Sequence, residues 1–417
     1  MSDGEKYYGV LLYGNRVGTL YSRGNYTWFN FSESYLHDID RPVLGLRFEE
    51  NLRGRYASAL RLPPWFSNLL PEGPLREWIA VDRRVSIDRE MELLAQVGRD
   101  LPGAVQVVEV SEPDDDKGNL ESTDVPHAAN AESGPSPWRF SLAGVALKFS
   151  MLAQGDRLSV PAVGEMGDWL VKFPDYRHAD VPRNEFTLMS IARSVGVHVP
   201  DVRLVHRDEI RGVPNRMWPN NEEWAYAVRR FDRTADAKRE LIHIEDFAQV
   251  RDKYSRDKYN GSFETVAALA YRGFDLDALR EVGRRLALFV LVGSGDAHFK
   301  NWSLIYLNRK VPELSPAYDI VATAPYRDPI DGVEDLGLKL DGSKRFAGVN
   351  LATFARFESR IDDKFGRTEA GLVEVARDVA RRLPQAWDEH AESLRSNPQL
   401  MTAIAEWISE HRPRLLG

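Results

Sequence analysis

The chain has 417 residues, 43% of them hydrophobic and 28% charged, which is typical of a globular protein with two or three domains. Its formal net charge of −8 at pH 7 provides no overall positive field for nucleic acid or an anionic membrane. With no cysteine it forms no disulfide, thiolate metal site or thiol nucleophile. We find no secretory signal and no apolar run of membrane-spanning length, so we expect a cytoplasmic protein.

Strand patterns open the chain and helical patterns follow. The run YYGVLLYGNRVGTLYSRGNYTWFNF alternates and is interrupted by GNRVG and SRGN, which predicts a β-meander with turns. PEGPLREWIAV and SIDREMELLAQVG then have helical spacing, the second with Ser86 as N-cap and Gly98 as C-terminal stop. We therefore expect residues 1–111 to form a small α+β domain.

Residues 112–137, EPDDDKGNLESTDVPHAANAESGPSP, have the composition of a flexible linker. They contain no aromatic residue and are rich in acidic residues, Pro, Ser, Gly and Asn. Such a segment buries too little apolar area to offset the entropy lost on ordering. We expect it to separate the first domain from the rest of the chain.

Two alternating strands are predicted after the linker, in RFSLAGVALKFSML and DWLVKFPD. In the second strand Lys172 lies on the face opposite that of Trp169, Val171 and Phe173. Lys172 is therefore predicted to project from a strand, away from the hydrophobic face.

The rest of the chain is predicted to be mostly helical. A helix with Pro182 in its first turn should stop at Gly196, and EWAYAVRRFDR then returns as a strand. The later segment LDALREVGRRLALFVLVG has the apolar spacing of a buried helix that ends at Gly293.

The sequence GDAHFKNWS follows this buried helix directly. Asp296 and Asn301 have the separation of the base and the metal-binding Asn in the kinase loop D-x-x-x-x-N. Lys300 between them can neutralise charge on a transferred phosphoryl group. After a hairpin predicted in WSLIYLNRKVPELSPAYDI, Asp319 arrives where a second Mg²⁺-binding carboxylate is needed. Upstream, Lys172 and Glu185 could pair and hold the lysine against nucleotide phosphates.

Simpler roles also exist for these residues. Asp296 and Asn301 could cap a turn, and His298, which has no clustered second histidine, fits loop packing better than metal binding. Lys172 could lie along a strand edge beside a solvated Glu185. The turn SLAG at 141–144 lacks the G-x-x-x-x-G-K-[ST] pattern of a P-loop NTPase.

Stretches along nearly the whole chain match one known family in order. They are FSNLLPEGPLRE, LLAQVGRDLPGAVQVV, RFSLAGVALKFS, LVKFP, NEFTLMSIARSVGVHVP, RRFDR, EDFAQV, KYNGSFETV, GDAHFKNWSLIY and SPAYDIVAT. By these stretches the chain resembles the HipA family of bacterial serine/threonine kinase toxins. The resemblance implies an α+β, protein-kinase-like two-lobed fold, with a small β-rich N-terminal subdomain at 1–111, an N lobe at 138–231 and a mostly helical C lobe at 232–417.

The resemblance also implies roles for individual residues. Asp296 matches the catalytic base, with Lys300 beside it, and Asn301 and Asp319 match the Mg²⁺ ligands. Residues implied to bind ATP are Ala143, Gly144, Val145, Ala146, Leu147, Lys148, Lys172, Glu185, Arg229, Arg230, Phe231, His298, Phe299 and Tyr318. Ser141 aligns with a loop serine whose autophosphorylation disrupts the phosphate-binding loop, although it could instead be a plain hydrogen-bonding residue. Arg229 stands where an acidic hinge residue is expected, so only backbone contacts to adenine are implied there.

The function implied by the resemblance is an ATP- and Mg²⁺-dependent protein kinase, the toxin of a toxin-antitoxin pair. Its implied partners are a small helix-turn-helix antitoxin of the HipB type, operator DNA through that antitoxin, and as substrate an aminoacyl-tRNA synthetase, notably the glutamyl type. Two alternatives remain open at this point: a catalytically silent, antitoxin-bound corepressor, and a small-molecule phosphotransferase, which does not account for the N-terminal domain.

Overall fold

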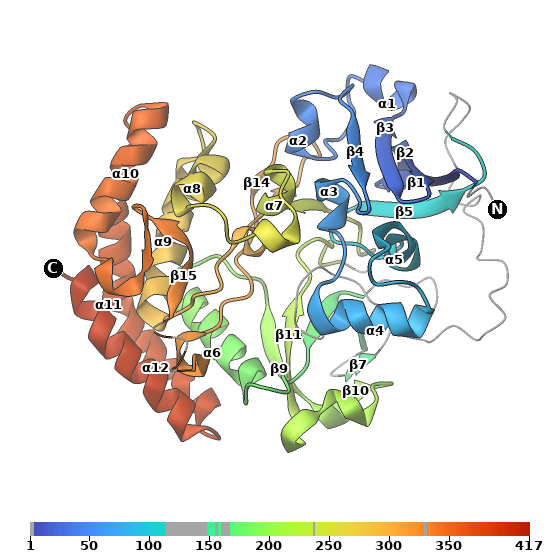
Figure 1. The fold of residues 1–417 in the computed structure, drawn as a ribbon. Coiled ribbons are helices and arrows are strands. Elements are labelled where there is room, and N and C mark those ends of the chain that lie inside the picture. Colours follow the sequence, from blue (N-terminus) through green and yellow to red (C-terminus); the bar gives the residue numbers. More distant parts are fainter. Residues whose placement is uncertain are drawn as a thin grey trace.

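The computed structural model describes residues 4–113, 148–154, 157–159, 167–236, 238–328, 330, 332 and 334–417. Figure 1 shows a β-rich half that contains the N-terminus and a helical half that contains the C-terminus. Within the described residues no helix is long and apolar enough to cross a membrane. The predicted Ser141 and Ala143 to Leu147, and all of the predicted linker after Pro113, lie outside the described residues.

The N-terminal domain is a five-stranded antiparallel sheet with helices on it, in the order β4-β3-β2-β1-β5. Its strands are β1 Lys6–Leu12, β2 Asn15–Arg23, β3 Tyr26–Phe31, β4 Tyr56–Ala59 and β5 Val105–Val110. Its helices are α1 Glu33–His37, α2 Leu46–Glu49, α3 Pro64–Ser67, α4 Gly73–Arg83 and α5 Glu90–Val97. The predicted meander is confirmed, but its first turn is only Tyr13 and Gly14, both with positive φ, so most of GNRVG belongs to β2.

The predicted N-cap at Ser86 is wrong. The N-cap residue of α5 is Arg89, because residues 86–89 close a turn of their own before the helix begins. The Ser86 hydroxyl accepts a hydrogen bond from the Asp88 N–H instead. The predicted stop at Gly98 is confirmed as the C-cap of this helix.

A six-stranded sheet follows, in the order β10-β7-β6-β8-β11-β9. Its strands are β6 Lys148–Gln154, β7 Arg157–Ser159, β8 Trp169–Lys172, β9 Val202–His206, β10 Ile210–Arg211 and β11 Trp224–Arg229. On one face, residues such as Val171 and Ala227 share a hydrophobic core with the N-terminal domain. On the other, Tyr226 and Val228 pack toward α6, Val181–Ser194. Side-chain alternation thus directs Lys172 toward α6, as predicted.

The strand predicted for EWAYAVRRFDR is shorter than expected. β11 ends at Arg229 because the next residues form a turn that buries Arg230 and Arg233. Both guanidinium groups bind Asp100 of the N-terminal domain, at 2.9 and 3.1 Å, and both bind Asp232. Because a buried charge is unfavourable unless it is paired, the chain turns here to pair these groups, although the local pattern would continue the strand.

The C-terminal half is built around one buried helix. The helices are α7 Phe247–Val250, α8 Phe263–Tyr271, α9 Leu276–Val292, α10 Leu351–Phe365, α11 Leu372–His390 and α12 Pro398–His411. As predicted, α9 is largely buried and ends at Gly293, which has φ 68°. α8, α11 and α12 pack against it, and in Figure 1 α10, α11 and α12 form the outer side of this half.

Two small sheets complete this half. The predicted hairpin after the GDAHFKN stretch is confirmed as β13 Ser303–Tyr306 and β14 Glu313–Leu314, and β12 His243–Asp246 pairs with β13. A further hairpin, β15 Asp335–Leu340 and β16 Ser343–Arg345, was not predicted. The two-lobed α+β fold is confirmed, with strands in the lobe that was expected to be mostly helical.

Candidate active site

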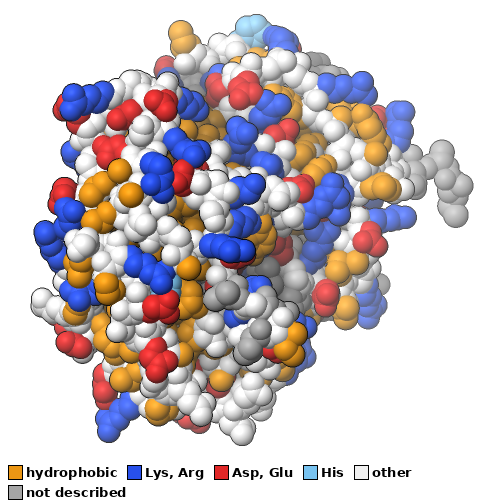
Figure 2. Space-filling view, turned by 60° about the vertical axis from the view of Figure 1, so that its left-hand side comes forward, with side chains coloured by type: hydrophobic (Ala, Val, Ile, Leu, Met, Phe, Trp, Pro, Cys, Tyr) orange, Lys and Arg blue, Asp and Glu red, His pale blue; other side chains and the backbone are white. Residues whose placement is uncertain are grey.

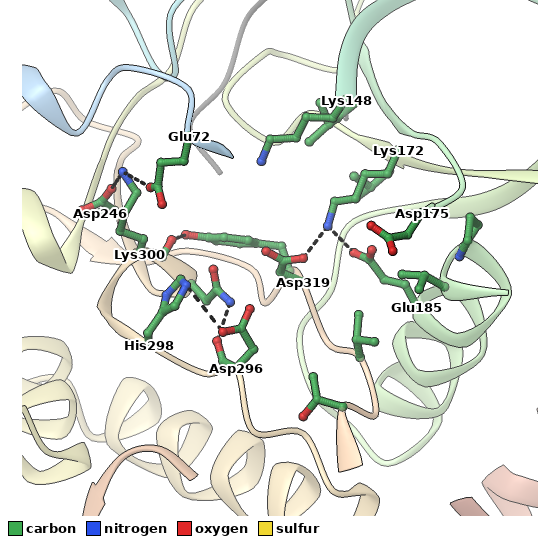
Figure 3. Close-up of a pocket in the computed structure, with 18 of the residues that line it drawn as sticks. Glu72, Lys148, Lys172, Asp175, Glu185, Asp246, Asp296, His298, Lys300 and Asp319 are labelled. Carbon is green, nitrogen blue, oxygen red and sulfur yellow. Dashed lines mark hydrogen bonds and ion pairs between the residues drawn. The ribbon is translucent and has the colours of Figure 1, made fainter. Parts of the chain in front are cut away.

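A cavity of about 760 Å³ lies where the three parts of the chain meet. Asn68 and Glu72 reach it from the N-terminal domain, Lys148 and Lys172 from the six-stranded sheet, and the predicted catalytic loop from the helical half. Figure 3 shows Glu72, Lys148, Lys172 and Asp296 around one space. The volume is in the range of cavities that hold nucleotide-sized ligands.

Lys172 is the centre of a buried ion-pair network. Its Nζ lies 2.6 Å from Oε1 of Glu185 on α6 and 2.5 Å from Oδ1 of Asp319. The predicted pairing of Lys172 with Glu185 is therefore present. Burial disfavours the charge on Lys172, but the carboxylates of Asp319 and Glu185 outweigh it and raise its pKa.

The two carboxylates of this network differ in protonation behaviour. Burial raises the pKa of Glu185 to about 7, although Lys172 acts against that rise. Asp319 is also opposed by burial, but Lys172 and then Lys148 hold its pKa well below its usual range. Asp319 is thus the carboxylate that stays ionised at neutral pH, as a cation ligand must.

Lys148 is a second ammonium group at the same cavity. It is buried, and in the described part of the chain its Nζ has no hydrogen-bond or ion-pair partner. Burial and then the neighbouring Lys172 lower its pKa to about 8. In Figure 3 it points into the cavity beside Lys172. A buried cation without a partner indicates a site for an anion.

The candidate catalytic loop, residues 295–303, follows α9 and contains a short 3₁₀ turn, Phe299–Asn301. The main-chain oxygen of Asp296 accepts hydrogen bonds from the His298 N–H and from Nδ2 of Asn301, each at 2.8 Å. Because its amide nitrogen is used in this way, Asn301 presents Oδ1 as its free acceptor. The carboxylate of Asp296 remains about half exposed at the cavity.

Lys300 has partners that sequence reasoning did not predict. Its Nζ donates to the main-chain oxygen of Asn68 at 2.9 Å and lies 3.1 Å from Oε1 of Glu72 and 3.6 Å from Oδ2 of Asp246. Lys258 meets the other oxygen of Glu72 at 3.0 Å. In this structure the charge of Lys300 is thus neutralised by protein groups, whereas its predicted partner is the transferred phosphoryl group.

The predicted hinge residues are only partly directed at the cavity. The Arg229 guanidinium donates to the Ala235 oxygen, and that of Arg230 is held by acidic side chains. The Phe231 ring, in contrast, lies 5.7 Å from the Tyr318 ring, and both line the cavity. Among the described residues the Phe231 N–H has no hydrogen-bond partner, so it is available to an adenine base.

His298 and Phe299 are placed differently from each other. His298 lines the cavity, and burial lowers the pKa of its imidazole, partly against the effect of Asp296. Phe299 is fully buried in the core of the helical half and is not among the residues that line the cavity. Its predicted contact with nucleotide has no support in this geometry.

Asn68, Glu72 and Asp246 were missed as site residues. They lie in FSNLLPEGPLRE and EDFAQV, segments noted only as family resemblance, and no spacing rule links them to Lys300. The described residues contain no cluster of three or more His, Asp or Glu side chains able to hold a metal ion. Asn301 and Asp319 offer two oxygen ligands, which suits Mg²⁺ because it takes its remaining ligands from water and phosphate.

Comparison with known proteins identifies related chains along the whole length. Residues 8–108 match the model of the HipA N-terminal domain, and residues 140–387 match that of the HipA-like C-terminal domain. The Sinorhizobium fredii protein named "Putative kinase Y4dM" is 37% identical over 414 residues, which cover 97% of this chain and 96% of that protein.

A second relative and a solved structure are also similar to this chain over most of its length. The Shewanella oneidensis serine/threonine-protein kinase toxin HipA is 26% identical over 384 residues, covering 84% of this chain and 81% of that protein. The structure of the Shewanella oneidensis HipA, HipB and operator DNA complex contains a chain that matches with a TM-score of 0.68 and 22% identity. That match covers 98% of this chain and 96% of the other, and it supports the fold.

Proposed function

Because this chain belongs to the HipA family of kinases, as its two matched regions and its relatives show, we propose that it transfers the γ-phosphoryl group of ATP to a serine or threonine hydroxyl of a protein. The observation that carries the proposal is the meeting of Lys172, Glu185, Asp296, Asn301 and Asp319 at one cavity. Each has the residue type that phosphoryl transfer requires at that place.

The cavity can bind the nucleotide through groups already in place. Lys148 and Lys172 present two ammonium groups for the phosphates, and Glu185 holds Lys172 in position. The adenine would lie toward Phe231 and Tyr318, where a free main-chain N–H and two aromatic rings are available. Positioning and charge stabilisation of this kind account for most of the catalysis of phosphoryl transfer.

Asn301 and Asp319 would hold Mg²⁺, because each has an oxygen without a partner among the described residues: Oδ1 of Asn301 and Oδ2 of Asp319. When bound, Mg²⁺ neutralises phosphate charge. Asp296 would accept the proton of the substrate hydroxyl, since its carboxylate is accessible from the cavity.

The biological role is proposed on the same family grounds. We propose that the chain is the toxin of a toxin-antitoxin pair, bound by a HipB-like helix-turn-helix antitoxin that carries the contact with operator DNA. The Shewanella oneidensis complex of HipA, HipB and operator DNA supports this by analogy. An aminoacyl-tRNA synthetase is the proposed substrate, and Ser141 the proposed site of inhibitory autophosphorylation.

The test compares wild-type protein with Asp296→Asn. Each is incubated with ATP and Mg²⁺ and then followed by intact-protein and peptide mass spectrometry, while ATP binding is measured separately. We expect phosphate on the wild type, including the Ser141 peptide, none on the variant, and equal ATP binding by both. Failure of the wild type to bind ATP would contradict the proposal and favour a catalytically silent corepressor.

A further inference from the structure

Tyr259 lies against the candidate catalytic base without lining the cavity itself. Its hydroxyl donates a hydrogen bond to Oδ1 of Asp296. Its ring meets the ring of His298 edge to face, with centroids 4.9 Å apart. The side chain belongs to the KYNGSF segment, which connects a short 3₁₀ turn to α8 and to which the proposed function assigns no role.

This segment is fastened to the catalytic loop. The Phe299 N–H donates to the Lys258 oxygen at 3.2 Å. Gly261 lies so close to Phe299 that a Cβ there would be 2.2 Å from Cζ of the ring. On the outer side, Nζ of Lys344 donates to the main-chain oxygen of Tyr259 at 3.2 Å. Tyr259 is therefore held in place by packing and hydrogen bonds, although its side chain is partly exposed.

The two oxygens of the Asp296 carboxylate have different surroundings. Oδ1 accepts the hydrogen bond of Tyr259 and lies 3.8 Å from Nε2 of His298. Oδ2 has no hydrogen-bond partner among the described residues. The main-chain oxygen of Asp296 is fixed by two further hydrogen bonds. The hydrogen bond from Tyr259 thus fixes the rotation of the Asp296 carboxylate and leaves Oδ2 free among the described residues.

We infer that Tyr259 is a positioning residue, whose hydroxyl holds Oδ1 of Asp296 so that Oδ2 receives the proton of the substrate hydroxyl. This inference rests on the proposed kinase function. In the reaction, the hydroxyl oxygen bonds to the γ-phosphorus, the bond from that phosphorus to the β–γ bridging oxygen breaks, and its electron pair leaves with ADP. The hydroxyl proton moves to Oδ2 and is later lost to water.

The electrostatics support a Tyr259 hydroxyl that keeps its proton and donates a hydrogen bond throughout the reaction. Burial and then the negative charge of Asp296 raise the pKa of the Tyr259 hydroxyl, so it stays protonated at neutral pH. The ammonium groups of Lys258 and Lys344 lie 5.5 and 5.8 Å from the ring centroid, over its face. These cation–π contacts help to hold the ring in place.

A different role of the Tyr259 hydroxyl would give the opposite effect on the reaction rate. If the Tyr259 hydroxyl stood in the place of the substrate hydroxyl, removing it would open the site and raise the rate. The close packing of the segment favours a tyrosine that stays. The two ideas therefore differ in the sign of the effect of one substitution.

The test is Tyr259→Phe, which keeps the ring and removes the hydroxyl. With Mg²⁺-ATP and dephosphorylated casein, ADP release and phosphate on casein and on the chain itself are measured over time. We expect kcat to fall about tenfold or more, since a hydrogen bond to a charged group is lost, while KM for ATP changes by less than about twofold. Because a smaller folded fraction would also lower the apparent kcat at unchanged KM, the fraction of each protein that binds ATP is measured as well, and kcat is expressed per ATP-binding site.

Tyr254→Phe is the matched control. Tyr254 lies five residues before Tyr259, ahead of the 3₁₀ turn, and its hydroxyl also forms hydrogen bonds, to Ser58 and to the Leu62 oxygen, but not to Asp296. We expect this variant to keep wild-type kcat. Equal losses in both variants would mean that the segment is merely structural, and an unchanged or higher rate in Tyr259→Phe would overturn the inference while leaving the kinase function intact. A wild type that neither binds ATP nor releases ADP would overturn the proposed function itself.

Discussion

Nζ of Lys300 lies 3.1 Å from Oε1 of Glu72, so a buried ion pair links the candidate catalytic loop to the N-terminal domain. Lys258, which precedes Tyr259, pairs with the other oxygen of the same carboxylate. Figure 3 shows Glu72 reaching the site from the N-terminal domain, with Lys300 between it and Asp246. The N-terminal domain therefore completes the wall of the cavity and contributes charge to it.

Replacing Glu72 by Gln should destabilise the protein in a pH-dependent way. Burial opposes the charge on Glu72, but Lys300 and then Lys258 lower its pKa from 4.5 to about 2. Its stabilising effect is therefore complete above pH 4.5, the unfolded value, and is lost as pH falls toward 2. We expect Glu72→Gln to lower the free energy of unfolding by about 3 kcal/mol at pH 7 and by clearly less at pH 3.

Urea unfolding at both pH values measures this difference. Glu77→Gln is the control, because Glu77 is an exposed residue of the same helix with no ion-pair partner among the described residues. A difference between wild type and Glu72→Gln that does not narrow at low pH would contradict the assignment of the effect to the carboxylate charge.

Lys172→Met should abolish nucleotide binding and weaken the fold. The substitution leaves Glu185 and Asp319 without their shared cation in a buried site, and removing one partner of a buried ion pair costs about 3 kcal/mol. We expect the rise in Tm that Mg²⁺-ATP gives the wild type to disappear. Lys238→Met, at an exposed position away from the cavity, should keep it. A Lys172→Met protein that Mg²⁺-ATP still stabilises would refute the role of this lysine.

Nucleotide affinity should fall as pH rises above 8. The pKa of Lys148, lowered to about 8 by burial and by Lys172, means that the free protein loses this charge above pH 8. Binding of phosphate must then be accompanied by proton uptake, which reduces affinity by up to about tenfold per pH unit. Isothermal titration calorimetry at pH 7 and pH 9 measures this change in nucleotide affinity. Lys148→Arg, which stays charged, should show a smaller change, and an equal change in both proteins would assign the pH dependence to another group.

Gly261→Ala should disturb the catalytic loop from behind. The new methyl group would meet the Phe299 ring, which is buried and begins the turn that contains Asn301. Overpacking of this kind costs about 1–3 kcal/mol of unfolding free energy, and we expect the rate of phosphoryl transfer to fall as well. Gly348→Ala is the control, since nothing lies within 4 Å of a Cβ there. Wild-type rates in both variants would show that the loop tolerates the shift.

Charged side chains of both signs are mixed on the surface of the molecule. Figure 2 shows lysine and arginine side chains interspersed with acidic ones over much of one face, in keeping with a chain that carries both kinds of charge in large number. Opposite charges close together at the surface contribute little stability each. The effects predicted above should therefore stand out because Glu72 and Lys172 are largely buried.

Local sequence pattern determined much of the fold. The alternation in the first strands, the apolar spacing of α9 with Gly293 at its end, and the hairpin after the catalytic loop depend on neighbours within a few residues, and each was predicted. The pairing of Lys172 with Glu185 was also predicted, because strand alternation fixes the face of the lysine and the following helix packs on that face.

Only the tertiary structure decided which charged groups meet. Lys300 forms an ion pair with Glu72, and Arg230 forms one with Asp100. Tyr259 donates a hydrogen bond to Asp296. In each case the two residues are distant in sequence. No periodicity encodes such contacts, because they depend on how the N-terminal domain, the sheet and the helical half pack together. Because an unpaired buried charge is unfavourable, most of these groups have partners, and the packing of the three parts decides which distant residue is the partner.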